Sequence, residues 1–416
     1  MPTAGRAEGV GRFLFVVPPL VGHVNPTVSV GRELAARGHR VAWTGHPEVV
    51  EPLLPAGANF LPVDVALPDV VLEAIANQPT RGLRGPAALK FLWQDFLVPL
   101  ARTMLPGVQA AVDGFVPDVV VVDQQAIAGA AVCERLGVPW VTTATTSAEL
   151  TDPLRTMPVV GAWVRALLAQ FLREAGLPDS VAGELDPRFS PTLVLAFSTA
   201  ALVGDVAGFP DHYAFVGPSI EDRTEETPFD WGWLDARRAL VLVSLGTLNW
   251  AVGVRFFGVA AQALAALDVQ GVIVAPPDLV PDAPPNVRVF PRIPQLALLR
   301  RAAAVVCHGG HNTVCEALAE GVPLVVAPIR DDQPIIAQQV VDAGAGLRIK
   351  FGRVRPDGLS RALHQVLTEP TLRAGAVRVR DSFAEAGGHR AAADRLVRLL
   401  APAPGTTAPR LVGGTA

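Results

Sequence analysis

Short apolar runs alternate with segments of helical periodicity over the first fifty residues of the chain. The run from Phe13 to Pro18 carries no charge, which is typical of a strand in a parallel sheet covered on both faces. We expect a loop from Pro19 to Asn25 and then a helix that begins at Pro26 and ends at Gly38. A second apolar run, Val41–Thr44, predicts the next strand. The pattern therefore indicates a strand–helix–strand unit of an α/β fold.

Two later segments repeat this order of strand, loop, helix, glycine and strand. In the first segment, Asp123 follows a strand and Gly137 ends the helix 14 positions later. In the second, His308 follows a strand and Gly321 ends the helix 13 positions later. Two matching units this far apart predict an α/β fold with two Rossmann-like domains, each with its own parallel sheet, facing a central cleft.

Composition shifts along the chain suggest where these domains begin and end. We expect residues 1–217 to form the N-terminal domain and residues 237–380 the C-terminal domain. An acidic, proline-containing linker is predicted over residues 218–236. Residues 381–400 are predicted to form a closing helix, and the Pro-, Gly- and Thr-rich residues 401–416 a disordered tail.

Composition and charge narrow the class of protein. Half of the 416 residues are apolar, which excludes disorder for the body of the chain. The net charge of −4, from 35 basic and 39 acidic residues, leaves no electrostatic footprint for nucleic acid or for an anionic membrane. Three cysteines without a CxxC pair argue against a disulfide framework and a zinc site. With no signal peptide and no apolar run of membrane-spanning length, we expect a cytoplasmic protein.

Two residues of the N-terminal segment are candidates for acid–base chemistry. His23 follows the first strand, at the sheet edge where open α/β folds bind ligands. The positive end of the next helix favours the neutral imidazole, which can accept a proton. Asp123 follows another strand and could orient that imidazole. The simpler interpretations are that His23 is a loop histidine without a catalytic role and that Asp123 is the N-cap of the next helix.

The second half carries small, hydroxylated and glycine-rich segments at two predicted strand ends. Ser244, Gly246 and Thr247 close one strand, and the segment His308–Thr313 opens a helix. Free N–H groups at such a helix start suit a phosphate or a diphosphate. An ordinary tight turn would use the same glycines. His308 and His311 lack a third nearby ligand, so no metal site is predicted.

Polar residues beyond these segments could contact a sugar nucleotide. Glu316 lies one turn into the predicted helix and could reach ribose hydroxyls, while Asp332 and Gln333 could bind a sugar ring. The latter two residues would also fit a solvated turn. The sequence has no GxGxxG after the first strand, no Walker A loop, no HExxH and no GxSxG. These absences disfavour dehydrogenases, P-loop kinases, zincins and α/β-hydrolases.

Taken in order, these segments resemble one enzyme family. The series from Pro294-Gln295 through His308–Thr313 and Gly321–Pro323 to Asp332-Gln333 resembles the donor-binding signature of family 1 glycosyltransferases of the GT-B fold. This family holds plant and bacterial enzymes that glycosylate small molecules, and the chain resembles its bacterial natural-product members, which use UDP- or dTDP-sugars. Gly22–Pro26 is similar to the family's loop with the catalytic histidine. Asp123 falls where the family places that histidine's acidic partner. The resemblance extends from Phe13 to about Leu400.

The resemblance implies an inverting, metal-independent hexosyltransferase without a cofactor. The N-terminal domain would bind a hydrophobic small-molecule acceptor, and the C-terminal domain a nucleotide sugar. His23 would deprotonate the acceptor hydroxyl and Asp123 would orient it. His308, Asn312, Thr313 and Thr247 would hold the diphosphate, Glu316 the ribose, and Asp332 and Gln333 the sugar. The full donor-binding set would be Ser244, Gly246, Thr247, Arg292, Ile293, Gln295, His308, Gly310, Asn312, Thr313, Glu316, Asp332 and Gln333.

The nucleotide base and the partners follow less directly. Plant members have a tryptophan three residues before the matching glutamine, where this chain has Arg292, whose planar guanidinium could stack on a base. A UDP-sugar is favoured over a dTDP-sugar because of Glu316 and the Asp332-Gln333 pair. The partners would be this donor and the acceptor, with neither nucleic acid nor a membrane span. A homodimer is left open.

The acceptor site is expected in the N-terminal domain. The candidates are the aromatic stretch Leu67–Leu100, with Phe91, Trp93 and Phe96, and the loop Thr142–Leu150 after the strand that begins at Trp140, with Thr145 and Thr146. An apolar pocket there would suit a hydrophobic aglycone. Aromatic residues at these spacings also fit the buried face of a helix.

Three other functions are considered. A non-hydrolysing sugar-nucleotide epimerase has the same two-domain layout, but His23 with Asp123 and the full donor signature favour a transferase. A catalytically idle homologue that activates a partner enzyme would often lose the donor signature, which this chain retains. A C-glycosyltransferase, attacking through an aromatic carbon, could use the same two residues and stays open.

Overall fold

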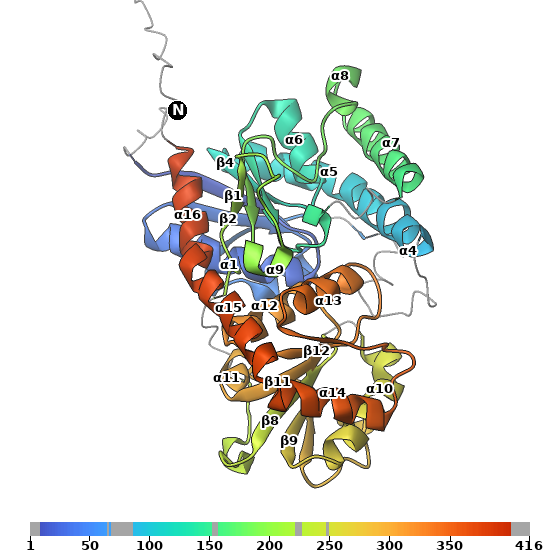
Figure 1. The fold of residues 1–416 in the computed structure, drawn as a ribbon. Coiled ribbons are helices and arrows are strands. Elements are labelled where there is room, and N and C mark those ends of the chain that lie inside the picture. The colour runs from blue at the N-terminus through green and yellow to red at the C-terminus, as the bar shows by residue number, and fades with distance from the viewer. Residues whose placement is uncertain are drawn as a thin grey trace, which may run out of the picture.

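The computed structural model describes residues 9–64, 66–67, 86–151, 157–220, 227–246 and 249–400. Within them the strands form two sheets, one in the N-terminal half (residues 9–220) and one in the C-terminal half (residues 227–400) (Figure 1). The N-terminal strands are β1 (Arg12–Val16), β2 (Arg40–Gly45), β3 (Asn59–Pro62), β4 (Val119–Asp123), β5 (Trp140–Ala144), β6 (Val194–Ala196) and β7 (Tyr213–Phe215). The C-terminal strands are β8 (Ala239–Ser244), β9 (Val269–Val274), β10 (Val287–Phe290), β11 (Ala302–Cys307), β12 (Leu324–Val326) and β13 (Gly346–Arg348).

Both sheets are parallel throughout their described strands. The order is β3-β2-β1-β4-β5-β6-β7 in the N-terminal sheet and β10-β9-β8-β11-β12-β13 in the C-terminal sheet. β1 pairs with β2 and β4, and β8 pairs with β9 and β11, so the first strand of each half lies at the point where the strand order reverses. The predicted α/β fold with two Rossmann-like parallel sheets is confirmed.

Helices connect and cover these strands. Those of the N-terminal half are α1 (Val21–Ala36), α2 (Pro47–Val50), α4 (Pro86–Lys90), α5 (Val98–Phe115), α6 (Ala128–Leu136), α7 (Pro158–Glu174), α8 (Asp179–Ala182) and α9 (Ala200–Val203). Those of the C-terminal half are α10 (Trp250–Ala265), α11 (Gln295–Leu299), α12 (His311–Ala319), α13 (Gln333–Asp342), α14 (Pro356–Thr368), α15 (Pro370–Ala386) and α16 (Gly388–Arg398). Residues Phe91–Leu97 form a π-helical segment, and single 3-10 turns lie at Glu51–Leu53, Glu149–Thr151, Trp231–Trp233 and Pro277–Leu279.

The all-apolar strands are explained by burial on both faces. Leu14 of β1 points into a core packed by α5, α6 and α7, whereas its neighbours Phe13 and Phe15 point into a core packed by α1 and α16. Alternate side chains of a strand point to opposite faces, so a strand covered on both sides needs apolar residues throughout. None of the described helices is both long enough and apolar enough to cross a membrane.

The repeated sequence segments form equivalent turns in the two halves. Gly137 follows α6 and Gly321 follows α12, and both have φ +65. This left-handed conformation costs glycine little and other residues more, which is why a glycine closes each helix.

The first helix begins earlier than the sequence predicts. The sequence predicts a loop to Asn25 and a helix from Pro26, but α1 starts at Val21 with Pro26 inside it. Leu20 is extended, and its carbonyl accepts hydrogen bonds from the N–H groups of His23 and Val24 at 2.9 and 3.1 Å. His23 therefore lies in the first turn of a helix and not in a loop.

The end of the described chain also differs from the prediction of one closing helix over residues 381–400. α15 ends at Ala386 because Gly387 has φ +86, and α16 starts at Gly388. α16 returns to the N-terminal half and packs on α1 (Figure 1). The predicted tail, 401–416, and residues 221–226 of the predicted linker lie outside the described residues. The domain boundaries themselves remain a prediction.

Candidate functional site

The carboxyl edge of the N-terminal sheet brings His23 and Asp123 together. Nδ1 of His23 lies 2.9 Å from Oδ1 of Asp123, the fully buried last residue of β4. Thr145, just after β5, donates to Oδ2 of Asp123 at 2.6 Å, and its hydroxyl lies 2.7 Å from Nδ1 of His23. The N–H of Gln125 donates to Oδ1 of Asp123 at 2.9 Å. The carboxylate is thus held on both oxygens, with the imidazole against it.

The charges around His23 set its protonation. Burial lowers the pKa of the imidazole, but the charge and hydrogen bond of Asp123, with further acidic charge from Asp332 and Glu149, raise it above its ordinary value. Because Nδ1 faces Asp123, Nε2 is the ring nitrogen that can take a proton from a bound hydroxyl. The side chain is 15% exposed, so the ring is accessible from the site.

His308 is a buried residue of the predicted donor-binding set. Its ring lies between two glycines, so that a Cβ on Gly246 would be 2.8 Å from its Cε1 and one on Gly310 would be 2.5 Å from its Nε2. Burial lowers the pKa of His308 to about 4, although a hydrogen bond with the Ser244 backbone opposes this. The ring is therefore neutral at pH 7. In the described part of the chain, its buried Nδ1 has no hydrogen-bond partner.

Two more predicted donor residues meet on neighbouring helices. Gln295, the first residue of α11, donates from Nε2 to Oε2 of Glu316 on α12 at 2.5 Å. Thr313, in the first turn of α12, is buried. At the end of β8, Oγ of Ser244 accepts a hydrogen bond from the N–H of Gly246 at 3.3 Å. The structure thus gathers Ser244, Gly246, Gln295, His308, Gly310, Thr313 and Glu316 around the ends of β8 and β11 and the start of α12.

Asp332 and Gln333, the residues predicted to bind the sugar, both form hydrogen bonds within the protein. Gln333 accepts the N–H groups of Ile329 and Arg330 through Oε1, at 2.9 and 3.1 Å. Asp332 accepts a hydrogen bond from Thr146 of the N-terminal half at 2.6 Å. A predicted donor residue and a predicted acceptor residue therefore touch across the two halves.

The structure describes three of the four remaining predicted donor residues. Arg292 is exposed, and Ile293 is buried in the core beneath the C-terminal sheet. Thr247 lies outside the described residues. Asn312 donates from Nδ2 to the carbonyl of Gly22 at 2.9 Å and so contacts the N-terminal half directly.

The aromatic residues proposed for the acceptor are mostly core. Trp93 and Phe96 are 2% and 5% exposed and belong to the cluster packed by α5, α6 and α7, and the half-buried Phe91 packs against it. Their contact with an acceptor remains a prediction. The part of the stretch from Pro68 to Gly85 lies outside the described residues.

Sequence reasoning missed a polar group beside the His23–Asp123 pair. Glu149 lies 3.5 Å from Nε2 of Gln125 and 3.4 Å from NH1 of Arg188, whose guanidinium lies over the Trp93 ring at 5.5 Å. Burial raises the pKa of the Glu149 carboxyl, and Arg188 opposes that shift. Glu149 stands in the loop that the sequence singled out after β5, whereas nothing local marked Arg188, which is distant along the chain.

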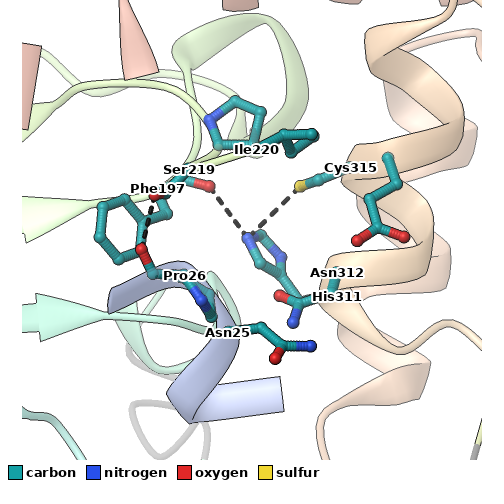
Figure 2. A pocket seen from close by; sticks show the side chains of 10 residues that line it. Asn25, Pro26, Phe197, Ser219, Ile220, His311, Asn312 and Cys315 are labelled. Atoms are coloured by element: carbon teal, nitrogen blue, oxygen red, sulfur yellow. Dashed lines mark hydrogen bonds between the residues drawn. The ribbon is translucent and has the colours of Figure 1, made fainter. Parts of the chain in front are cut away.

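Polar contacts also seal the junction of the two halves. Nε2 of His311 lies 3.1 Å from the carbonyl of Phe197 and 3.4 Å from Sγ of Cys315. Figure 2 marks both contacts with dashed lines. Its Nδ1 lies 3.3 Å from Oγ of Ser147. Burial lowers the pKa of His311, so the neutral ring serves as a hydrogen-bonding contact. Among the described residues, no three His, Cys, Asp or Glu side chains gather as a metal site.

Comparisons with known proteins point to sugar transfer. Residues 260–399 match the family described as the C-terminal domain of the erythromycin biosynthesis protein CIII-like proteins. The chain is 32% identical over 405 residues to 4'-demethylrebeccamycin synthase of Lentzea aerocolonigenes, covering 90% of this chain and 96% of that protein. It is 27% identical over 402 residues to the NDP-glycosyltransferase YjiC of Bacillus licheniformis, covering 92% and 96%. The solved structure of the kitacinnamycin glycotransferase aligns with a TM-score of 0.75 at 28% identity, covering 94% of this chain and 99% of that one.

Proposed function

Because this chain belongs to the family 1 glycosyltransferases of the GT-B fold and is a hexosyltransferase, we propose that it moves a hexose from a nucleotide diphosphate sugar, preferably a UDP-sugar, to a hydroxyl of a hydrophobic small molecule. The observation that carries the proposal is the His23–Asp123 pair, in which Nδ1 of His23 lies 2.9 Å from Oδ1 of Asp123. The proposed reaction inverts the anomeric carbon and needs no metal.

In the proposed reaction, His23 is the general base. Asp123 holds Nδ1 and stabilises the imidazolium that forms when Nε2 takes the proton of the acceptor hydroxyl. The freed oxygen attacks the anomeric carbon from the side opposite the diphosphate. The bond between the anomeric carbon and the diphosphate oxygen breaks, and the nucleoside diphosphate leaves with the electron pair of that bond.

The C-terminal half would stabilise the leaving group. The first turn of α12 offers backbone N–H groups and the positive end of a nine-residue helix, which suit a diphosphate. The neutral His308 ring can donate a hydrogen bond to the diphosphate, so that no metal ion is needed to stabilise the leaving group. Glu316 and Gln295, which lie beside this turn, are proposed for the ribose and the base edge, and Asp332 and Gln333 for the sugar hydroxyls.

Replacing His23 tests the central assignment. We expect His23→Ala to lower turnover by about 10²–10⁴, since it removes a general base, with little change in the dissociation constant of UDP. Turnover would be measured with UDP-glucose and dTDP-glucose and a panel of phenolic and polyketide hydroxyl acceptors, with the glycoside detected by mass. Titration calorimetry with UDP and dTDP, without added metal, would give the binding constants.

The matched control is His364→Ala, because His364 is an exposed histidine on α14. It should retain full turnover. An unchanged rate in His23→Ala would refute the base assignment. Binding of dTDP in preference to UDP would overturn the donor preference alone, and loss of activity in chelator would contradict metal independence.

A further inference from the structure

A proline inside α1 leaves one backbone carbonyl of the catalytic turn without its helical partner. In a regular helix the carbonyl of Gly22 would accept the N–H of residue 26, four positions later. Residue 26 is Pro26, which has no N–H. The open carbonyl belongs to the peptide unit that joins Gly22 to His23. A hydrogen-bond donor to this carbonyl therefore affects the position of the helical turn that carries His23.

The missing partner comes from the other half of the molecule. Nδ2 of Asn312 donates to the carbonyl of Gly22 at 2.9 Å. Asn312 lies in the first turn of α12, the helix start that is proposed to face the diphosphate. A Cβ on Gly22 would be 3.7 Å from the same Nδ2, so the two helices are in close contact at this point.

A further hydrogen bond and a small cavity lie beside this contact. Ser219 donates to the carbonyl of Pro26 at 2.6 Å. Pro26, Asn25, Asn312 and Cys315 line a cavity of about 20 Å³, which is roughly the space of one water molecule (Figure 2). With so little space at the junction, movement of Asn312 would be transmitted to the first turn of α1.

We propose that Asn312 is a positioning residue for His23. Its amide supplies the hydrogen bond that Pro26 cannot, and so fixes the turn that carries the base only when the donor-binding half is seated against it. The inference rests on the proposed role of His23 as the general base. It gives Asn312 a task separate from the diphosphate contact implied by the family resemblance.

A double-mutant cycle with Pro26 tests the inference. In the full chain, Asn312→Ala should lower kcat by about 10- to 100-fold, as expected for a misplaced catalytic group, while any rise in the dissociation constant of UDP from the lost diphosphate contact should be clearly smaller than that loss of kcat. Pro26→Ala restores an N–H that can bond the Gly22 carbonyl within the helix. In that background Asn312→Ala should lower kcat by less than about 3-fold.

Two further variants keep the result interpretable. Asn312→Asp keeps the side-chain volume but removes the N–H donors, so it should also lower kcat. This variant tests the inference even if Pro26→Ala fails to fold. Gln338→Ala removes an exposed amide on α13 and should change neither kcat nor UDP binding.

The possible outcomes separate this inference from the proposed function. An equal loss of kcat in both backgrounds, a full kcat in Asn312→Asp, or a rise in the UDP dissociation constant that matches the loss of kcat would overturn the positioning role. If His23→Ala retains full turnover, the proposed function fails and the inference fails with it. If His23→Ala is inactive but Asn312→Ala is not, only the inference fails.

Discussion

At the scale of single residues, the acid–base behaviour of His23 depends on one carboxylate. Burial by itself would lower the pKa of the imidazole, and Asp123 supplies the largest opposing effect through its charge and hydrogen bond. The protonated form is inactive as a base. Activity should therefore fall as the pH drops through the raised pKa of His23 and should level off above it.

Asp123→Asn should move this acidic limb. Without the charge, burial and the remaining acids act on His23, and its pKa falls, so the limb of kcat/KM shifts to lower pH. The plateau rate should also fall by about 10²–10⁴, because the imidazolium loses its stabilising partner. The pH dependence of kcat/KM measures both effects. An unshifted limb would contradict the role of Asp123, and Asp113→Asn, an exposed carboxyl on α5, is the matched control.

At the scale of elements, the turn after β8 and the start of α12 enclose His308 through Gly246 and Gly310. Gly310 has an ordinary φ of −64 and could accept a side chain by its backbone alone. The constraint is space, because a Cβ there would lie 2.5 Å from Nε2 of His308. The ring must stay where it is to face the start of α12.

Gly310→Ala should therefore displace the His308 ring and weaken nucleotide binding. We expect the dissociation constant of UDP to rise about tenfold or more, equivalent to at least about 1.4 kcal/mol. Titration calorimetry checks this. Gly258→Ala in α10, where a Cβ would meet nothing within 4 Å, should leave UDP binding unchanged. Equal affinities in the two variants would show that the contact with His308 has no bearing on the donor.

At the scale of the whole molecule, the last helix ties the C-terminal half to the first strand and helix. Leu396 of α16 is fully buried in the core formed by Phe13, Phe15 and α1. On the exposed side of α16, Asp394 pairs at 2.6 Å with Arg37, the residue directly after α1. The buried contact should dominate, since an exposed ion pair contributes little.

Leu396→Ala should lower the free energy of unfolding by about 2–5 kcal/mol, the usual cost of truncating a buried leucine. Asp394→Ala should lower it by no more than about 1 kcal/mol. Urea unfolding followed by circular dichroism compares the two. If Asp394→Ala proved the more damaging variant, the packing of α16 on α1 would not be what holds the two halves together at this point.

The sequence by itself determined the order of strands and helices and the strand ends at which the chemistry lies. Those features are local: an uncharged apolar run such as Phe13–Pro18 predicts a doubly covered strand, and Gly137 and Gly321 mark helix ends wherever the chain goes. The same local pattern misplaced the start of α1, because a proline more often opens a helix than lies inside one.

Only the tertiary structure decided which distant side chains meet. Thr145 joins the His23–Asp123 pair, Arg188 reaches Glu149, and α16 returns to α1. Asn312 bonds a carbonyl 290 positions away in the chain. The physical reason is that such contacts follow from how the two sheets and their helices pack against each other, and no periodicity within a short segment encodes that arrangement.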